Sequence, residues 1–400
     1  MEKNNKTLNV PHLRFPEFSG EWEICNLKRF ATKITKKNKG NMCSNVLSNS
    51  ANYGIIPQSD FFDRSIANSD NTDTYYVIEG GDFVYNPRKS TTAPYGPINV
   101  YEGTEVGIIS PLYLCFKVEW INKKYLYHYF KSNKWHPYMY INGDSGARHD
   151  RVSIKDDVFL DMPLLVPSQK EQWKITLLLD AIDKRIETQR KIIKKYESLI
   201  KGLISDVNKG KICLCKSVFL RDILTERHEK NICNHEVCSV SVSHGVINQV
   251  DYLGRSFAAK EVLHYNVVNY GDIVYTKSPT GDFPYGIVKR SQLEKPVAVS
   301  PLYGVYRPVN DIISKYLHLY FKSSANTKNY LHKLIQKGAK NTINITNQHF
   351  LDNKILIPDG DWLYSIVSFA GAIEQKIKIE NSSLSMLEYQ KNYLLSRLFI

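Results

Sequence analysis

The stretch APYGPINVYEGTEVGIISPLY, residues 93–113, is matched 190 positions later by FPYGIVKRSQLEKPVAVSPLY, residues 283–303. Both stretches place Pro-Tyr-Gly and Ser-Pro-Leu-Tyr at the same spacing. The match extends over most of the chain: KYLYHYFKS from Lys124, for example, corresponds to KYLHLYFKS from Lys315. Solenoid repeats are only about 20 to 50 residues long, so a two-copy repeat of this length predicts a duplicated domain.

The first part of each copy has the composition of a β-rich domain. Short runs of Val, Ile, Tyr and Phe are broken at close spacing by Gly, Pro, Asn and Asp, which is typical of strands joined by tight turns. The segment from Lys124 predicts a short helix with Leu126, Tyr129 and Phe130 on one side. We expect this aromatic face to pack in a core; a base-stacking platform is the alternative.

Two longer helices are predicted after Pro167 and Pro358. In each, seam positions recur at alternating spacings of three and four, as in a coiled coil, and the two patterns match 191 residues apart. Because two exposed apolar seams would favour aggregation, we predict that the helices pack on each other in antiparallel orientation. The alternative is that each helix packs on its own domain. The predicted seam contains Ile182, Ile186, Ile193, Tyr196, Leu203, Ile373, Ile377, Leu384, Leu387 and Leu394.

These patterns predict an α+β fold. Two homologous β-rich domains are separated by two long helices that form an antiparallel coiled coil. The predicted boundaries are 1–167 for the first domain, 168–210 for the first helix, 211–358 for the second domain and 359–400 for the second helix. A helix of about 30 residues spans roughly 45 Å, so the helices would act as a spacer.

Charge indicates the class of partner. The chain has 53 Lys and Arg residues against 40 Asp and Glu, a formal net charge of +13. Such an excess favours a polyanion, and nucleic acid is the first candidate; charge kept for solubility alone is the alternative. The polar N-terminus lacks the features of a signal peptide, and no apolar run reaches the ~20 residues of a membrane helix, so we expect a cytoplasmic protein without membrane contact.

Motifs for catalysis or metal binding are missing from the sequence. It contains no phosphate-binding G-x-x-x-x-G-K-[ST] motif and no Gly-rich cofactor turn between a strand and a helix. Cys213, Cys215, Cys233 and Cys238 could suggest a zinc site, but structural sites usually pair thiolates with a two-residue gap, and here the gaps are one and four. We therefore predict no catalytic residue and no metal ligand.

Three segments carry a family resemblance. VPHLRFPEFSGEWEICNLKRF (residues 10–30), PSQKEQWKI (167–175) and LEYQKNYLLSRLF (387–399), with the two-copy layout, closely resemble the specificity subunit of type I restriction-modification systems. The resemblance covers essentially the whole chain. It implies a non-catalytic subunit whose two target recognition domains each read one half of a bipartite, non-palindromic site in double-stranded DNA, while the helices set the gap between the halves.

The resemblance also implies partners. Two methyltransferase subunits would dock on the chain, and restriction subunits would supply the motor and nuclease. S-adenosylmethionine, ATP and Mg would belong to those partners, with no cofactor in this chain. Two adjacent positions depart from the internal repeat: Glu171-Gln172 at the start of the first helix becomes Trp362-Leu363 in the second, which puts any partner contact there in doubt. A protein-protein scaffold and a self-contained DNA-modifying enzyme are the alternatives.

Candidate DNA-contacting residues lie where the two copies differ. If homologous domains read different sequences, their reading loops should differ while the flanks match, as do NPRKSTTA (residues 86–93) and TKSPTGDF (276–283). GARHDR (146–151) and GAKNT (338–342) form a second basic pair. Base edges require hydrogen-bonding side chains and phosphates require positive charge. We predict contacts from Arg88, Lys89, Ser90, Thr91, Arg148, Arg151, Lys277, Ser278, Thr280, Lys340 and Asn341.

Overall fold

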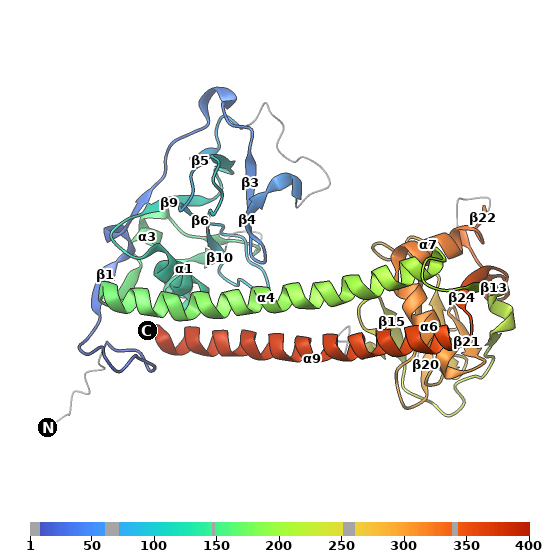
Figure 1. Cartoon of the computed structure of the whole chain (residues 1–400). Coiled ribbons are helices and arrows are strands. Elements are labelled where there is room, and N and C mark those ends of the chain that lie inside the picture. The colour runs from blue at the N-terminus through green and yellow to red at the C-terminus, as the bar shows by residue number, and fades with distance from the viewer. Residues whose placement is uncertain (1–8, 61–71, 146–148, 251–260, 338–342) are drawn as a thin grey trace. The chain divides into compact units, whose positions relative to one another are not determined.

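The computed structural model describes residues 9–60, 72–145, 149–250, 261–337 and 343–400. The chain forms two compact units, Met1–Gln189 with Ser383–Ile400, and Arg190–Ser382. Each unit contains a β-rich body and one stretch of each of two long helices, α4 (Gln169–Asn208) and α9 (Asp361–Leu398) (Figure 1). No helix among the described residues is both long and apolar enough to cross a membrane.

The body of the first unit is built around a four-stranded antiparallel sheet in the order β2-β9-β6-β7. A second sheet has the order β4-β3-β8-β5, and β1 pairs with β12 beside the start of α4. The elements of this body are β1 (Glu23–Asn26), β2 (Ala31–Lys33), β3 (Val46–Ser50), β4 (Gly54–Pro57), β5 (Tyr76–Ile78), β6 (Phe83–Tyr85), β7 (Ile98–Val100), β8 (Gly107–Ile109), β9 (Leu114–Val118), α1 (Lys123–Lys131), α2 (His136–Asn142), β10 (Asp144–Ser145), β11 (Val152–Ser153), α3 (Asp156–Leu160) and β12 (Pro163–Val166).

The body of the second unit repeats the central sheet, while the strands of its second sheet form two separate pairs, β15-β16 and β17-β20. Its four-stranded sheet has the order β14-β21-β18-β19, and β13 pairs with β24 as β1 pairs with β12. The elements are β13 (Cys215–Phe219), β14 (Leu224–Glu226), β15 (Cys238–Ser241), β16 (Gly245–Asn248), β17 (Asn266–Val268), β18 (Ile273–Thr276), β19 (Ile287–Arg290), β20 (Val297–Val299), β21 (Gly304–Pro308), α6 (Asp311–Lys322), α7 (Ser324–His332), β22 (Gln336–Lys337), β23 (Ile343–Asn344), α8 (Asn347–Phe350) and β24 (Lys354–Pro358). The predicted domain duplication is therefore present in the order of the central strands.

The repeated Pro-Tyr-Gly has a steric cause. Gly96 and Gly286 have φ of +85° and +98°, and a Cβ there would lie 2.1 Å from the Asn86 carbonyl oxygen and 1.9 Å from that of Thr276. Only glycine lets the chain return this close to the preceding strand. The tyrosine of the triplet supplies a backbone acceptor: the Tyr85 hydroxyl donates to the Tyr95 carbonyl, 3.0 Å, and the second unit repeats this bond.

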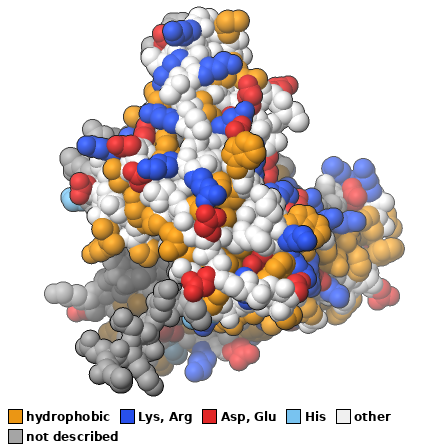
Figure 2. Space-filling view, turned by 90° about the vertical axis from the view of Figure 1, so that its left-hand side faces the viewer, with side chains coloured by type: hydrophobic (Ala, Val, Ile, Leu, Met, Phe, Trp, Pro, Cys, Tyr) orange, Lys and Arg blue, Asp and Glu red, His pale blue; other side chains and the backbone are white. Residues whose placement is uncertain are grey.

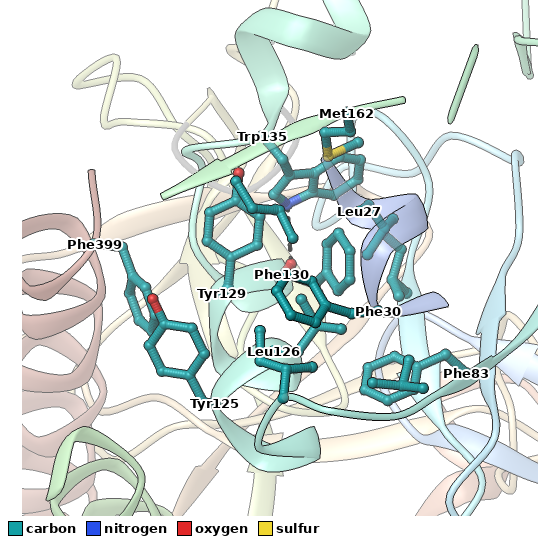
Figure 3. Packing of buried hydrophobic residues seen from close by; sticks show 14 of the residues in the cluster. Leu27, Phe30, Phe83, Tyr125, Leu126, Tyr129, Phe130, Trp135, Met162 and Phe399 are labelled. Atoms are coloured by element: carbon teal, nitrogen blue, oxygen red, sulfur yellow. Dashed lines mark hydrogen bonds between the residues drawn. The ribbon is translucent and has the colours of Figure 1, made fainter. Parts of the chain in front are cut away.

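The predicted aromatic face of α1 packs in the core of the first unit. Leu126, Tyr129 and Phe130 are buried, together with Trp135 from the start of α2 and Phe399 from the end of α9 (Figure 3). The Phe399 ring centroid lies 5.9 Å from that of Tyr129. Burial at this depth excludes these rings from stacking on a base, so the core interpretation is correct.

The two long helices pack against each other within each unit, with opposite chain directions. In the first unit Leu179 and Ile182 from the N-terminal half of α4 share a core with Leu394 and Leu398 from the C-terminal end of α9 (Figure 1). In the second unit the C-terminal half of α4 shares a core with the N-terminal half of α9. The residues involved there are Ile200, Ile204, Val207, Leu363, Ile366, Val367, Ala370 and Ile373. The α+β fold with antiparallel long helices is thus confirmed.

The seam positions selected from the sequence differ in depth. Ile182, Ile186, Ile193, Ile373 and Leu394 are buried. The other five are partly buried against the two cores: Tyr196, Leu203, Ile377, Leu384 and Leu387. Polar pairing also contributes, since Lys391 of α9 donates to Asp183 of α4.

The departure at Glu171-Gln172 has an explanation inside the chain. Glu171 is 2 % exposed and accepts two hydrogen bonds from the Arg14 guanidinium, both 2.9 Å. Gln172 accepts from the Asn122 amide, 3.0 Å, and donates to the Pro167 carbonyl, 2.9 Å. These side chains fix the N-terminal segment and the start of α1 to α4. In the second unit the equivalent Trp362 is half exposed, while Leu363 joins the core.

Candidate nucleic-acid interface

The two segments that differ between the copies, 86–93 and 276–283, share one backbone framework. We call them the first and second reading turns. Ser90 and Ala93 exchange two backbone hydrogen bonds, 3.0 and 3.2 Å, and Thr280 and Phe283 exchange two, 3.1 and 2.9 Å. The two turns therefore have the same pattern of backbone hydrogen bonds. The two residues at the tip differ: they are Thr91-Thr92 in the first turn and Gly281-Asp282 in the second. Gly281 has φ of +50° and nothing within 4 Å of a Cβ position, so its tip is open.

The first reading turn is joined to the second basic segment of its unit. Arg88 and Arg151 form an antiparallel bridge, the Lys89 amide donates to the Asp150 carbonyl, 2.8 Å, and the Val152 amide donates to the Pro87 carbonyl, 2.9 Å. Both segments are candidates from the sequence, and the fold places them side by side. Both arginines are exposed, so two guanidinium groups are available on one surface.

Tyr113 of the Ser-Pro-Leu-Tyr motif is within the electrostatic influence of these cations. Burial raises the pKa of the Tyr113 hydroxyl, while its hydrogen bond with Ser48 and the charges of Arg151 and Arg88 lower it. The repeated motif therefore belongs to the same surface as the reading turn. Its neighbour Leu112 is 60 % exposed.

The second unit arranges the equivalent segments around a cavity of about 520 Å³. The lining residues are Lys277, Ser278, Pro301, Leu302, Tyr303, Thr346 and Asn347. Lys277 and Ser278 come from the second reading turn, Pro301 to Tyr303 from the second Ser-Pro-Leu-Tyr motif, and Thr346 and Asn347 from the start of α8. Burial lowers the pKa of Lys277, and Glu226 partly opposes that shift.

Several sequence candidates lie on these surfaces. Arg88, Ser90, Thr91 and Arg151 are exposed in the first unit, as are Ser278 and Thr280 in the second. Lys89 and Lys277 are partly exposed. The remaining candidates, Arg148, Lys340 and Asn341, lie outside the described residues. For all of them, contact with DNA stays a prediction.

Two features of the surface were missed by the sequence analysis. Leu302 is 73 % exposed and lines the cavity beside the second reading turn, and its counterpart in the first unit, Leu112, is also exposed. The hairpin β3–β4 also contributes, since the Thr92 hydroxyl donates to the Asn52 side-chain oxygen at its tip, 3.2 Å. The repetition of the leucine in both Ser-Pro-Leu-Tyr motifs was the available signal.

Positive charge is dispersed on one face of the molecule (Figure 2). On the face of the molecule drawn in Figure 2, Lys and Arg side chains lie among acidic and hydrophobic side chains instead of forming one patch. Within the described ranges, no group of three or more His, Cys, Asp or Glu side chains is placed to hold a metal ion. Of the cysteines weighed for zinc, the Cys213 and Cys215 sulfur atoms are 3.8 Å apart, Cys233 is exposed and Cys238 is buried.

Comparison with known proteins identifies the fold. No protein-family model and no curated protein sequence matches the chain. A chain of a type I restriction-modification system, solved to explain complex assembly and conformational transition, matches with a TM-score of 0.53 and 11 % identity over 97 % of this chain and 99 % of that chain. The type I restriction-modification S subunit from M. genitalium matches with a TM-score of 0.53 and 12 % identity over 98 % of this chain and 99 % of that chain. Over nearly its whole length, this chain has the fold of a type I restriction-modification specificity subunit.

Proposed function

We propose that this chain is the non-catalytic DNA-specificity subunit of a type I restriction-modification complex. Each β-rich body acts as a target recognition domain for one half of a split, non-palindromic site. The observation that carries the proposal is the pair of reading turns, which have the same hydrogen-bonded backbone and different exposed side chains. A duplicated framework with altered side chains is what two readers of different short sequences require. The fold similarity and the net charge of +13 support the same function.

Each reading turn combines the two kinds of contact that DNA recognition needs. Arg88 and Arg151 carry the charge to hold phosphates, and Ser90 and Thr91 carry hydroxyls that can donate to or accept from base edges. Exposed Leu112 adds an apolar group that fits a thymine methyl. The second turn offers Lys277, Ser278 and Thr280 in the same roles. The long helices would fix the number of unread base pairs between the halves.

Methyltransferase subunits are the partners that we propose for the long helices. Trp173 on α4 and Tyr364 on α9 stand 191 residues apart at equivalent positions, and they are 59 % and 61 % exposed. Aromatic side chains are enriched in protein interfaces, and their exposure at matched positions fits one partner subunit on each half. S-adenosylmethionine, ATP and Mg would be bound by the methyltransferase and restriction subunits. A cytoplasmic location follows from a complex that acts on cellular DNA.

The test is to co-express the chain with its cognate methyltransferase subunit in a host without DNA methylation and to map modified adenines across the genome. The proposal predicts a single split motif, with two short defined halves around a fixed unspecified gap. A soluble complex that modifies no motif would contradict it and favour a scaffold. Methyl transfer by the purified chain alone would favour a self-contained enzyme.

A further inference from the structure

The second unit has a cleft of about 990 Å³ beside the second reading turn. Its walls come from the tip of the β15–β16 hairpin, the end of the reading turn at Asp282 and Phe283, strand β19, the junction of α6 and α7, and the facing sides of α4 and α9. The charged residues that line it are Lys201, Lys289, Arg290, Lys322, Lys378, Asp282 and Glu374, with His318 beside them. Positive charge therefore exceeds negative charge inside the cleft.

Lys289 is the unusual member of this set. It is 6 % exposed, and among the described residues its ammonium group makes no hydrogen bond or ion pair. That group lies 5.8 Å from the centroid of the Phe283 ring. Burial, and to a smaller extent the charge of Lys322, lower the pKa of Lys289 to about 8. The side chain is nearly buried and lines the cleft, and a cation in such surroundings without an anionic partner is costly, which indicates that an anion in the cleft completes the site.

Three charged groups of the cleft, Lys322, Arg290 and Glu374, are already paired. Lys322 donates to Glu374, 2.8 Å, and Arg290 donates to Asp311, 2.6 Å, and to the Ser314 hydroxyl, 2.9 Å. Burial raises the pKa of Glu374, but hydrogen bonds and charges from His318 and Lys322 outweigh it and lower that pKa to about 2. The charge of Glu374 is therefore committed to those two residues, and Lys289 remains uncompensated.

Helix α7 adds donors for an anion. Ser323, Ser324 and Ala325 line the cleft at its N-terminus, and the Ser323 hydroxyl caps the helix by accepting from the Asn326 amide. The first N–H groups of a helix have no partner inside the helix, and the helix dipole favours negative charge at this end. A phosphate placed between Lys289 and these amides would satisfy both.

The first unit provides an internal comparison. There Asn99 occupies the position of Lys289, pairing across the sheet with Val84 as Lys289 pairs with Val274. Asn99 donates to Asn49, 2.6 Å, and accepts from Lys131, the counterpart of Lys322, at 2.5 Å. In the second unit Val240 replaces Asn49, so the internal polar network is gone. One copy closes this position with its own side chains, and the other leaves a buried cation uncompensated.

We propose that the Lys289 cleft is a phosphate-binding site of the second unit, and that it holds a backbone phosphate of the DNA beside the second reading turn. This inference rests on the proposed function, because the reading turn brings the duplex to the cleft. Free phosphate and nucleotides share the same chemistry and are separated from DNA by the test.

The test compares the chain in complex with its methyltransferase subunits with two variants. Lys289→Asn installs the residue of the first unit and removes a buried charge, so it should fold; Lys333→Asn removes an exposed lysine as the control. Inorganic phosphate should show excess ³¹P line broadening with the unmodified complex and with Lys333→Asn, and should lose it with Lys289→Asn. The salt dependence of binding to a duplex that carries the target motif should fall by about 0.9 in log-log slope for Lys289→Asn only.

The outcomes are distinct. Equal ³¹P broadening by the unmodified complex and Lys289→Asn would overturn the phosphate site. If the ³¹P broadening depends on Lys289 but the salt slope of DNA binding is the same for Lys289→Asn and the unmodified complex, the site does not hold the DNA backbone. That result would favour a free phosphate compound as the ligand. If the complex still methylates a split motif in either case, the proposed function survives while this inference fails.

Discussion

Replacing Gly286 by Ala tests whether the repeated Pro-Tyr-Gly turn is required by sterics. The Cβ of an alanine would lie 1.9 Å from the Thr276 carbonyl oxygen, and the residue would keep a φ of +98°. The obstructing atom belongs to the backbone of β18, in the central sheet, so it cannot move aside like a flexible side chain. Gly281 in the preceding second reading turn has φ of +50° and open space around it, which makes Gly281→Ala the matched control.

The expected size of the effect follows from these two terms. A left-handed backbone costs an alanine about 1 to 2 kcal/mol, and crowding in a packed site adds about 1 to 3 kcal/mol. Gly286→Ala should therefore destabilise the second unit by about 2 to 5 kcal/mol, and Gly281→Ala by the first term alone. Gly96→Ala should do in the first unit what Gly286→Ala does in the second, because its Cβ would lie 2.1 Å from the Asn86 oxygen.

Native-state hydrogen exchange read by mass spectrometry measures these losses unit by unit. Peptides from β18 and β19 should lose protection in Gly286→Ala, and peptides from β6 and β7 should lose it in Gly96→Ala. The control Gly281→Ala should leave most of the protection of β18 in place. Equal losses from Gly286→Ala and Gly281→Ala would refute the steric reasoning.

Charge and exposure lead to three more predictions. Arg88→Ala with Lys89→Ala should weaken DNA binding by the complex and lower the log-log salt slope by about 0.9 for each phosphate that is no longer neutralised, whereas an unchanged slope would remove both residues from the interface. The folded-state pKa of Glu374 is about 2, below its ordinary value of 4.5, so its charge stabilises the fold above pH 4.5 and this contribution disappears as the pH falls toward 2. The Tm of Glu374→Gln should therefore fall less over that pH range than the Tm of the unmodified chain. Parallel Tm profiles of the two proteins would contradict this prediction. Trp173→Ala and Tyr364→Ala should leave the Tm of the chain within about 2 °C and reduce co-purification of methyltransferase subunits, while full retention of the subunits would place docking elsewhere.

Periodic features of this chain could be predicted from sequence because their physical cause is local. Apolar residues at alternating spacings of three and four lie on one face of a helix, and Ile182, Ile186 and Ile373 are buried on that face. The sequence repeat predicted the duplicated central sheet, because similar patterns of strands and turns fold to similar topology. The strand order β2-β9-β6-β7 of the first unit corresponds to β14-β21-β18-β19 of the second.

Contacts between distant segments could not be predicted in the same way. The reading turn at Arg88 and the segment at Arg151 were selected separately, and only the fold shows that they are bridged. Glu171-Gln172 raised the question of a partner contact, whereas their partners Arg14 and Asn122 lie in the same chain, 157 and 50 positions away. The isolation of Lys289 also depends on neighbours from several elements, which no spacing along the sequence reports.

The central claim is that two separate bodies read two halves of one DNA site. Its most direct test exchanges residues 1–167 for the corresponding part of another specificity subunit, co-expresses the hybrid with the methyltransferase subunit, and maps the modified adenines. We predict a new sequence in one half of the motif, with the other half and the length of the gap unchanged. A hybrid that is active on a motif changed in both halves, or on the original motif, would contradict the claim.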